Sequence, residues 1–296
     1  MKRWLEITPD YRCNNRCLGC YSVQDAGPSM TPREALTALE QGRRDGVGSL
    51  WIGGGEPTMR RDLFAIVKAA RERGYERIKL QTNGMMFAYA DFTRRCAEAG
   101  VTEVSFAAKG ATATSHDAKT RTPGSFDLMV SGMREARAAG LALEGDVLVY
   151  ASTVDEVPAT VSMLASHGVG RVRLWLLSAA ETSDENVRAE VPRLRDVARA
   201  AIAARETVDS QAIVIESLHT PPCMFDDVTQ RDLAYDVASL GLTVVNPGGH
   251  AFDLEASPIE GGVYVDACTG CSARSHCRGL RADYISLHGA SEATRI

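Results

Sequence analysis

The sequence has no long hydrophobic run: no stretch of about 18 apolar residues, the length that a membrane-spanning helix needs, occurs anywhere in it. Its first residues, MKRWLEITPDYRC, contain no apolar segment typical of a signal peptide. It also lacks dense runs of lysine or arginine, which are typical of nucleic-acid-binding proteins, and its net charge is −5. We therefore expect a cytoplasmic protein whose partners include neither membranes nor nucleic acids.

What the sequence does have is a regular alternation of apolar runs and amphipathic stretches within its 296 residues, of which 45% are hydrophobic. The short apolar runs predict strands, and their alternation with helical patterns predicts βαβ units in a parallel sheet. The expected strands cover residues 3–8, 48–53, 76–82, 102–108, 141–149, 170–177 and 211–216.

The segments between these strands have apolar residues at spacings of three and four, which is typical of helices. Thr31 and Pro32 form a start signal for the first helix; Ser125 is a candidate N-cap for the fourth, and Gly140 follows its end. The expected helices cover residues 31–46, 60–73, 88–99, 124–139, 154–167 and 190–206.

About six βα repeats predict an α/β fold, a partial (β/α)6-type or complete barrel, in which functional residues follow the strands. The repeat pattern ends near residue 217, and the remainder is richer in Pro, Gly and Asp. We therefore expect two domains, a barrel over residues 1–217 and a smaller C-terminal domain over residues 218–296.

Eight cysteines are present, and clustered cysteines in a reducing compartment bind metal more often than they form disulfides. Cys13, Cys17 and Cys20 follow the first expected strand, so three thiolates share one tight loop. Thiolates suit both iron–sulfur clusters and zinc, but a structural zinc site needs a fourth ligand nearby. Three ligands instead fit a cubane cluster with one iron left open.

This cysteine spacing resembles the signature of the radical S-adenosylmethionine (radical SAM) superfamily, and the resemblance covers roughly residues 1–217. Gly53-Gly54-Gly55-Glu56-Pro57 resembles its glycine-rich motif after the second strand, and Gln81-Thr82-Asn83-Gly84 its third-strand ending. The segment from Ser105 to Lys109 resembles the region after the fourth strand. One departure is Gly19, which stands where many members have an aromatic residue before the third cysteine.

The resemblance implies that Cys13, Cys17 and Cys20 hold a 4Fe–4S cluster whose open iron binds S-adenosylmethionine. One electron then cleaves that molecule to a 5′-deoxyadenosyl radical, which takes a hydrogen atom from a substrate. A flavodoxin- or ferredoxin-type donor would supply the electron. The residues that this resemblance implies in cofactor binding are Gly53, Gly54, Gly55, Glu56, Asn83, Ser105, Lys109 and, for packing against the adenine, Tyr21.

A second group of cysteines lies in the C-terminal part of the chain, at positions 223, 268, 271 and 277. The Cys268, Cys271 and Cys277 spacing resembles the auxiliary-cluster extensions known as SPASM and Twitch. Residue 281 is Arg where a full SPASM domain has a further cysteine, so the four cysteines suffice for one auxiliary 4Fe–4S cluster. Four thiolates also suit tetrahedral zinc, with His276 nearby, and that alternative stays open.

Several single residues have two interpretations each. Cys96, on an expected outer helix, is either a buried small side chain or a hydrogen-atom donor. Glu144 and Asp146 on the fifth strand either point into the barrel or remain exposed, while Arg171, Arg173 and Trp175 on the sixth share one face. His250 is expected on the surface, in a turn.

Three functional hypotheses follow. The first is an oxidative radical enzyme, which performs a dehydrogenation or crosslinking on a small natural product or a peptide. The second is a redox-neutral radical epimerase or isomerase, which needs a hydrogen donor such as Cys96. The third is a non-catalytic iron–sulfur or zinc protein, which has no use for the glycine motif. Since only about a dozen residues precede Cys13, the sequence favours a small substrate over a peptide.

Overall fold

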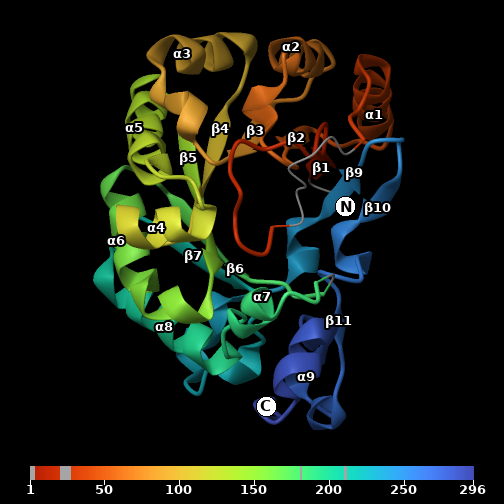
Figure 1. Ribbon diagram of the computed structural model, residues 1–296. Coiled ribbons are helices and arrows are strands. Elements are labelled where there is room, and N and C mark those ends of the chain that lie inside the picture. Colours follow the sequence, from red (N-terminus) through yellow and green to blue (C-terminus); the bar gives the residue numbers. More distant parts are fainter. Residues whose placement is uncertain (1–3, 21–27, 181, 210–211) are drawn as a thin grey trace.

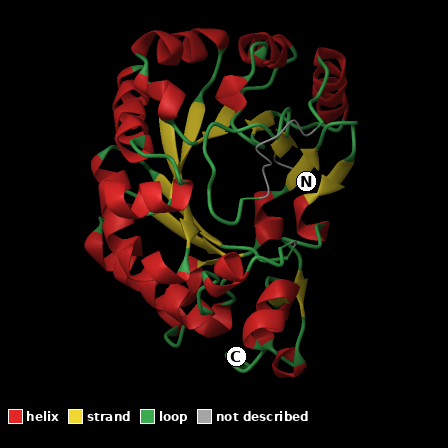
Figure 2. Ribbon diagram, in the orientation of Figure 1, coloured by secondary structure: helices red, strands yellow, loops and turns green. Residues whose placement is uncertain are grey.

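The computed structural model describes residues 4–20, 28–180, 182–209 and 212–296. Its central feature is a ten-stranded sheet with the order β10-β9-β1-β2-β3-β4-β5-β6-β7-β8, in which all neighbours are parallel except β9 and β10. Helices cover one face of this sheet, and the strands lie inside them (Figure 1, Figure 2). Within the described residues the sheet ends at β10 and β8, so it is an open, partial barrel, as the repeat pattern predicts.

All seven strands expected from the sequence are present, with ends shifted by a few residues. They are β1 (Trp4–Ile7), β2 (Ser49–Ile52), β3 (Arg77–Thr82), β4 (Glu103–Ala108), β5 (Ala142–Val149), β6 (Arg171–Leu176) and β7 (Val214–Leu218). The sequence pattern does not reveal β8 (Ala234–Tyr235), β9 (Leu242–Val245), β10 (Ala251–Asp253), β11 (Gly262–Val263) and β12 (Leu280–Arg281).

The six expected helices are present too, and three shorter ones are added. The expected set is α1 (Pro32–Arg44), α2 (Leu63–Glu72), α3 (Ala90–Ala99), α5 (Ser125–Ala138), α6 (Val157–Ser166) and α8 (Leu194–Thr207). The additional ones are α4 (Ala113–Thr120), α7 (Glu185–Ala189) and α9 (Ala282–His288).

Two of the predicted helix ends test the capping rules. Thr31 caps α1 with a full capping box to Glu34, followed by Pro32, as predicted. The prediction for Ser125 was wrong, because Gly124 is the N-cap of α5 and Ser125 is its first residue. The Ser125 hydroxyl instead donates to Asp117 Oδ1 at 2.8 Å, and that carboxylate also accepts from the Phe126 backbone, which satisfies the helix start from outside.

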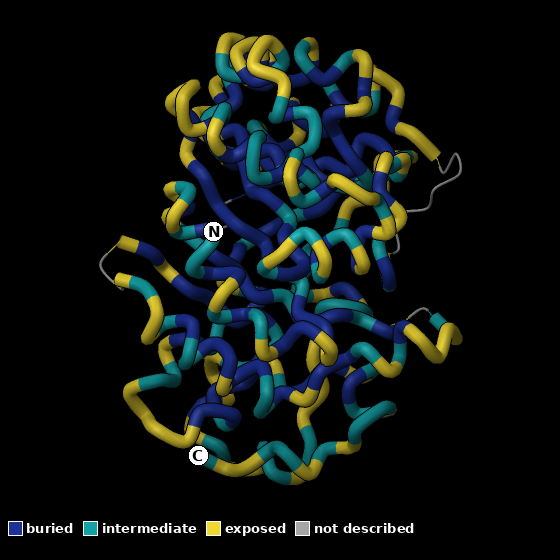
Figure 3. Tube along the Cα trace, turned by 60° about the vertical axis from the view of Figure 1, so that its left-hand side comes forward, coloured by how far each residue is buried: buried dark blue, intermediate teal, exposed yellow. Residues whose placement is uncertain are grey.

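The two faces of the sheet have different cores. Alternate residues such as Leu5, Ile7 and Leu80 face the helices and belong to the larger apolar cluster. The opposite face of β1 and β2 carries Trp4 and Trp51, whose rings meet edge to face at 6.1 Å. Figure 3 shows buried backbone running through the middle of the molecule and exposed residues on its outer turns. The second face forms the barrel lumen, which is where polar strand residues gather.

The sheet continues past residue 217. Strand β9 pairs in parallel with β1, from Trp4 opposite Leu242 to Ile7 opposite Val245, and β8 pairs with β7. Residues that follow the predicted boundary therefore extend both sides of the barrel. The division into domains of residues 1–217 and 218–296 stays a prediction.

Candidate active site

The first three cysteines lie on the long loop that follows β1. The loop is held from α4, since the backbone N–H of Arg16 donates to Thr120 O at 3.0 Å and that of Leu18 to Lys119 O at 2.8 Å. The Tyr150 hydroxyl, after β5, donates to Leu18 O at 3.0 Å. Two parts of the barrel rim, α4 and the residue after β5, therefore position the segment that carries the thiols.

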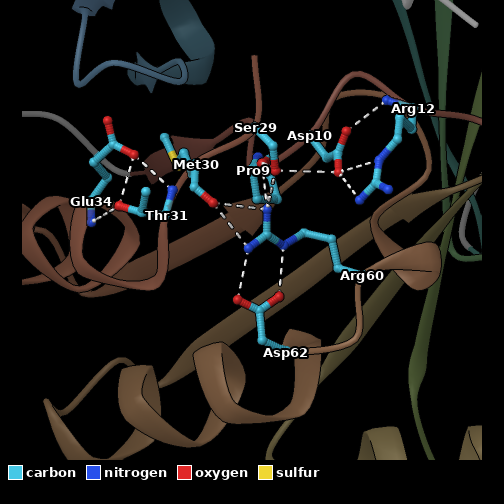
Figure 4. A network of polar contacts seen from close by, with 9 residues as sticks. All are labelled: Pro9, Asp10, Arg12, Ser29, Met30, Thr31, Glu34, Arg60 and Asp62. Carbon is cyan, nitrogen blue, oxygen red and sulfur yellow. Dashed lines mark hydrogen bonds and ion pairs between the residues drawn. The ribbon is translucent and has the colours of Figure 1, made fainter. Parts of the chain in front are cut away.

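Both ends of this loop meet at one buried arginine (Figure 4). Arg60 Nη1 donates to the carbonyl oxygen of Pro9 at 2.6 Å and to that of Met30 at 3.1 Å, and it also reaches Ser29 Oγ at 2.9 Å. Asp62 accepts two hydrogen bonds from the same guanidinium, at 2.8 and 2.7 Å. Arg60 thus hydrogen-bonds both to the segment before Cys13 and to the segment before α1, and holds the two together. No sequence motif indicated this role.

The glycine-rich motif packs directly beneath the loop. The backbone N–H of Gly55 donates to Asp10 O at 2.9 Å, and that of Glu56 to Arg12 O at 2.8 Å. A Cβ atom on Gly55 would lie 2.2 Å from Arg12 O, and Gly54 has a φ of +97°. Only glycine allows this approach, so the motif places its backbone against the cysteine loop.

The carboxylate of Glu56 accepts hydrogen bonds from several neighbouring protein groups. Its carboxylate accepts hydrogen bonds from Thr82 Oγ1 at 2.7 Å, from the Asn83 backbone at 2.8 Å, and from both the backbone (3.1 Å) and the hydroxyl (2.5 Å) of Thr58. Burial raises the pKa of Glu56, and these donors work against that rise. The side chain therefore ties the glycine motif to the end of β3. Its predicted contact with the cofactor stays a prediction.

Asn83 and Lys109 lie near the thiols, and their predicted contacts with the cofactor stay predictions. Asn83 Nδ2 donates to Asn14 Oδ1 at 2.7 Å and lies 3.9 Å from Cys13 Sγ. Lys109 is buried just after β4. Burial raises the pKa of Cys17, and the positive charge of Lys109 opposes that rise. Ser105 is also buried, but its hydroxyl donates to Asp146 Oδ2 at 2.6 Å within the lumen. Tyr21 lies outside the described residues.

The thiols suit iron as ligands. All eight cysteines are free, and burial raises the pKa of Cys13 to about 11, with Glu56, Cys17 and Cys20 adding to that rise. Such thiols ionise when a metal supplies compensating charge. Within the described residues no three His, Cys, Asp or Glu side chains converge to suit one metal ion. A cubane cluster requires no such convergence, because each thiolate binds a different iron.

A pocket of about 320 Å³ opens beside these cysteines. Cys17, Gly19 and Cys20 form one wall, and Ser178, after β6, and Val187 of α7 form another. Gly19 has a φ of +71°, and a Cβ atom there would lie 2.7 Å from Leu177 Cδ1. An aromatic side chain at this position would not fit, which gives the departure at Gly19 a physical reason. The pocket volume lies within the range of small-molecule sites.

Below the rim, the lumen carries charged and polar side chains. Asp146 accepts from Gln81 Nε2 at 3.0 Å, from Ser105 Oγ and from Trp175 Nε1 at 2.8 Å. Glu144 pairs with Lys79 Nζ at 2.6 Å and with Arg173 Nη1 at 2.8 Å.

Another ion pair in the lumen joins Arg171 on β6 to Glu216 on β7. These contacts show that four of the strand side chains point into the barrel, as the first of their two interpretations has it: Glu144, Asp146, Arg173 and Trp175. Cys96, by contrast, is buried in α3 within the helix-facing core, and His250 is exposed.

The second group of cysteines also comes together. Cys223, Cys268, Cys271 and Cys277 line one small cavity, together with apolar residues that include Leu280 and Ile296. Burial raises the pKa of Cys277 to about 11, and Cys223 and Cys268 add to that rise. Cys223 lies 45 residues from Cys268 in sequence, so the fold, not the local spacing, brings it to the other three. His276 is exposed and is absent from the lining of this cavity.

A model of the radical SAM superfamily matches residues 7–164, which contain the cysteine loop and the glycine motif. The chain belongs to this superfamily. Membership of this superfamily implies a 4Fe–4S cluster and S-adenosylmethionine as cofactors. The third hypothesis, a non-catalytic protein, is thereby set aside.

Curated radical SAM relatives include proteins that make different products. A probable GTP 3′,8-cyclase of Saccharolobus solfataricus is 30% identical over 141 residues, covering 46% of this chain and 44% of that protein. The pre-heme d1 synthase of Dinoroseobacter shibae is 30% identical over 181 residues, covering 59% of this chain and 43% of that protein. The chain therefore spans less than half the length of these two relatives.

Solved radical SAM structures share the fold over the whole chain. Streptococcus suis SuiB bound to S-adenosylmethionine superposes with a TM-score of 0.73 at 13% identity, covering 100% of this chain and 76% of that one. Methylornithine synthase superposes with a TM-score of 0.58 at 16% identity, covering 100% and 84%. At these identities the likeness shows the fold alone. Among the described helices, none is long and apolar enough to cross a membrane.

Proposed function

We propose that this radical SAM enzyme carries out an oxidative reaction, a dehydrogenation or a crosslinking, on a small natural product or a peptide. The observation that carries the proposal is the meeting of Cys223, Cys268, Cys271 and Cys277 around one cavity in a chain that already has a complete first cysteine group. When bound, the first cluster with S-adenosylmethionine supplies a hydrogen-abstracting radical, and a second cluster supplies an electron acceptor.

The roles of the first-site residues follow from their positions. Cys13, Cys17 and Cys20 would hold the first cluster, and the pocket beside Cys17, Gly19 and Cys20 would take the cofactor. The backbone of Gly53, Gly54 and Gly55 would bind the methionine moiety, supported through Glu56, which orders that backbone. Lys109 would pair with the carboxylate of the methionine moiety.

Asn83 would contact the cofactor from the end of β3, next to Cys13. The hydroxyl of Ser105 donates to Asp146, so it points into the lumen. It would act in the lumen, on the substrate side of the cofactor. Tyr21 stays a proposal from the sequence alone.

The C-terminal residues 218–296 would form the auxiliary-cluster region of the Twitch or SPASM type. If all four cysteines bind, no iron stays open, and the cluster accepts an electron instead of binding substrate. The substrate would lose a hydrogen atom to the cofactor-derived radical, a proton to a base and an electron to the second cluster. Those losses together amount to a two-electron oxidation.

The redox-neutral alternative needs a hydrogen donor facing the substrate. Cys96 does not meet that need, because it lies on the buried face of α3, in the core between the helices and the sheet. Its position favours the interpretation as a packing residue, and the oxidative proposal gains from it.

Both substrate classes have support from similar proteins. SuiB, which shares the fold, was solved with its precursor peptide SuiA, and the curated relatives include enzymes named for small molecules. We propose a flavodoxin- or ferredoxin-type protein as the electron donor and the cytoplasm as the location.

Metal analysis after anaerobic reconstitution tests the proposal. Wild type is expected to hold about eight irons, and both Cys13→Ala/Cys17→Ala/Cys20→Ala and Cys268→Ala/Cys271→Ala about four. Cys96→Ala is the matched control and should retain the wild-type content. About four irons in the wild type, with zinc in the C-terminal region, would remove the electron acceptor and with it the oxidative reaction.

A further inference from the structure

One carboxyl group in the lumen takes no part in the pairs described above. Glu6 lies on β1 between Leu5 and Ile7, which face the helices, so its side chain points to the opposite face. A Cβ atom on Gly53, after the neighbouring β2 (Figure 1), would lie 2.6 Å from Glu6 Oε1. The carboxyl group therefore occupies the space where a side chain at position 53 would stand, directly below the glycine motif.

Glu6 has no partner among the residues that the structure describes. The residue is half-buried and keeps part of its accessible surface, and burial raises the pKa of its carboxyl group. Among the residues that the structure describes, none donates a hydrogen bond to it or forms an ion pair with it. Leaving a largely buried carboxylate unpaired is costly, so a cation that reached Glu6 would offset that cost.

The other lumen carboxylates differ from Glu6 in this respect. Asp146 accepts from three donors, and Glu144 is paired with Lys79 and Arg173. Glu260 lies 2.6 Å from His219 Nε2. Unlike these three carboxylates, Glu6 has no partner among the described residues, and it lies next to Gly53 of the glycine motif.

The neighbouring charges of Glu6 are mostly negative. The pKa of Glu6 is raised to about 8, mainly by burial, with Asp146 and Glu260 contributing to the rise and Lys79 opposing it. Lys79 is already engaged by Glu144, and it lies 3.9 Å from the centre of the Trp51 ring. Tyr11 also faces Glu6, and its pKa is raised by burial and by that carboxylate. An added cation would offset the negative charge that these groups concentrate.

We propose that Glu6, with Asp146 beside it, binds a positively charged nitrogen of the substrate, an ammonium or guanidinium group, and so holds the substrate in the lumen below Gly53. The inference rests on the proposed function and narrows its substrate class to cationic compounds or to a basic side chain of a peptide. It does not depend on the oxidative outcome.

The site also links substrate binding to proton release. Below about pH 8 the empty site holds a protonated Glu6, and a cation binds the ionised form. Affinity should therefore rise up to about tenfold per pH unit below that value and level off above it. The titratable groups that face Glu6 are Tyr11, Lys79, Asp146 and Glu260, and Glu260 is paired with His219.

The test is calorimetric titration of n-butylammonium chloride into the anaerobically reconstituted, unreduced holoenzyme saturated with S-adenosylmethionine. Wild type and the control Glu206→Gln, an exposed glutamate, should bind it with an affinity that rises about tenfold between pH 6.5 and 7.5. Glu6→Gln should bind at least about tenfold more weakly and without pH dependence, as expected for loss of a charged partner. Glu6→Asp, checked for iron content, should keep the pH dependence.

Three results would overturn the inference: equal binding to Glu6→Gln, tighter binding of butyrate than of butylammonium, or binding that disappears when S-adenosylmethionine is added. The last would assign Glu6 to the cofactor. N-acetyl-lysine methylamide in place of butylammonium separates a peptide side chain from a free amine, and binding of either supports the cationic site. Because no reductant is present, failure here is distinct from failure of the radical function, which shows as absent 5′-deoxyadenosine.

Discussion

Arg60 Nη1 lies 2.6 Å from the carbonyl oxygen of Pro9, and this contact fixes the chain just before the first cysteine. The same carbonyl oxygen accepts from the backbone N–H of Met30 at 2.9 Å, so the loop that holds all three thiols closes at one point. The loop's geometry therefore depends on a residue of the segment between the glycine motif and α2. This dependence makes Arg60 a positioning residue.

Replacing Arg60 should loosen that closure. Arg60→Ala removes a buried guanidinium bound to Asp62 and to the backbone, and should lower the free energy of unfolding by about 2–4 kcal/mol. It should also reduce iron retention in the first site and broaden the electron paramagnetic resonance signal of the reduced cluster. The exposed neighbour Arg61→Ala is the control and should change none of these. Similar iron content and spectra in both variants would refute the positioning role.

Gly55 should tolerate no side chain. Its Cβ atom in Gly55→Ala would lie 2.2 Å from the carbonyl oxygen of Arg12, a backbone atom that cannot move without displacing the cysteine loop. Production of 5′-deoxyadenosine should fall by at least about 100-fold, since catalytic geometry is lost with shifts of about 1 Å. Gly170→Ala, where no atom lies within 4 Å of the added methyl group, is the matched control. Unchanged cleavage by Gly55→Ala would show that the motif does not position the cofactor.

Glu144 should stabilise the lumen electrostatically. Burial alone would raise its pKa, but Lys79 and Arg173 outweigh burial and lower the pKa to about 2. Its stabilising contribution is therefore present above about pH 4.5, the ordinary value, and is lost as the pH falls towards 2. Glu144→Gln leaves two buried cations without their partner and should cost about 3 kcal/mol at pH 7.

Denaturant unfolding at pH 7, 5 and 3 measures this effect. The difference between wild type and Glu144→Gln should shrink at pH 3, because wild type begins to lose the same interaction. Glu206→Gln, on the exposed face of α8, should match wild type throughout. A constant difference at all three pH values would mean that Glu144 acts through packing and not through its charge.

Cys96 should be dispensable for the chemistry. Because it is buried beneath α3, Cys96→Ala should leave substrate turnover unchanged and cost only about 1 kcal/mol of stability from the lost sulfur contacts. A redox-neutral enzyme that relied on Cys96 as hydrogen donor would instead lose turnover while still consuming S-adenosylmethionine. Comparing product with 5′-deoxyadenosine for this variant separates the two reactions.

Much of this site was predictable because its chemistry lies in short motifs. The three cysteines and the glycine motif each follow an apolar run that predicts a strand. Because the carboxyl ends of parallel strands meet at one edge of the sheet, these motifs are expected to lie together. Two-residue periodicity likewise predicted that Arg173 and Trp175 share a face, and they do. Local patterns suffice where the function depends on neighbours in sequence.

Other features depend on partners far away in the chain. Strand β9 lies in a segment rich in turn residues and enters the large sheet by pairing with β1, more than 200 residues earlier. From its own segment, Glu6 would be predicted to be an ordinary exposed glutamate on a strand. Nothing in that segment indicates which face of the strand lies in the lumen. Arg60 has no motif at all, since its partners are backbone carbonyl groups that every residue carries.

The most direct test of the account is the reductive cleavage of S-adenosylmethionine by the reconstituted protein under anaerobic conditions with dithionite. Wild type should form 5′-deoxyadenosine and methionine in equal amounts, and Cys13→Ala/Cys17→Ala/Cys20→Ala should form neither while its C-terminal region keeps its own iron. Equal cleavage by the two proteins, or none by a wild type that carries its full iron, would contradict the assignment of the first three cysteines.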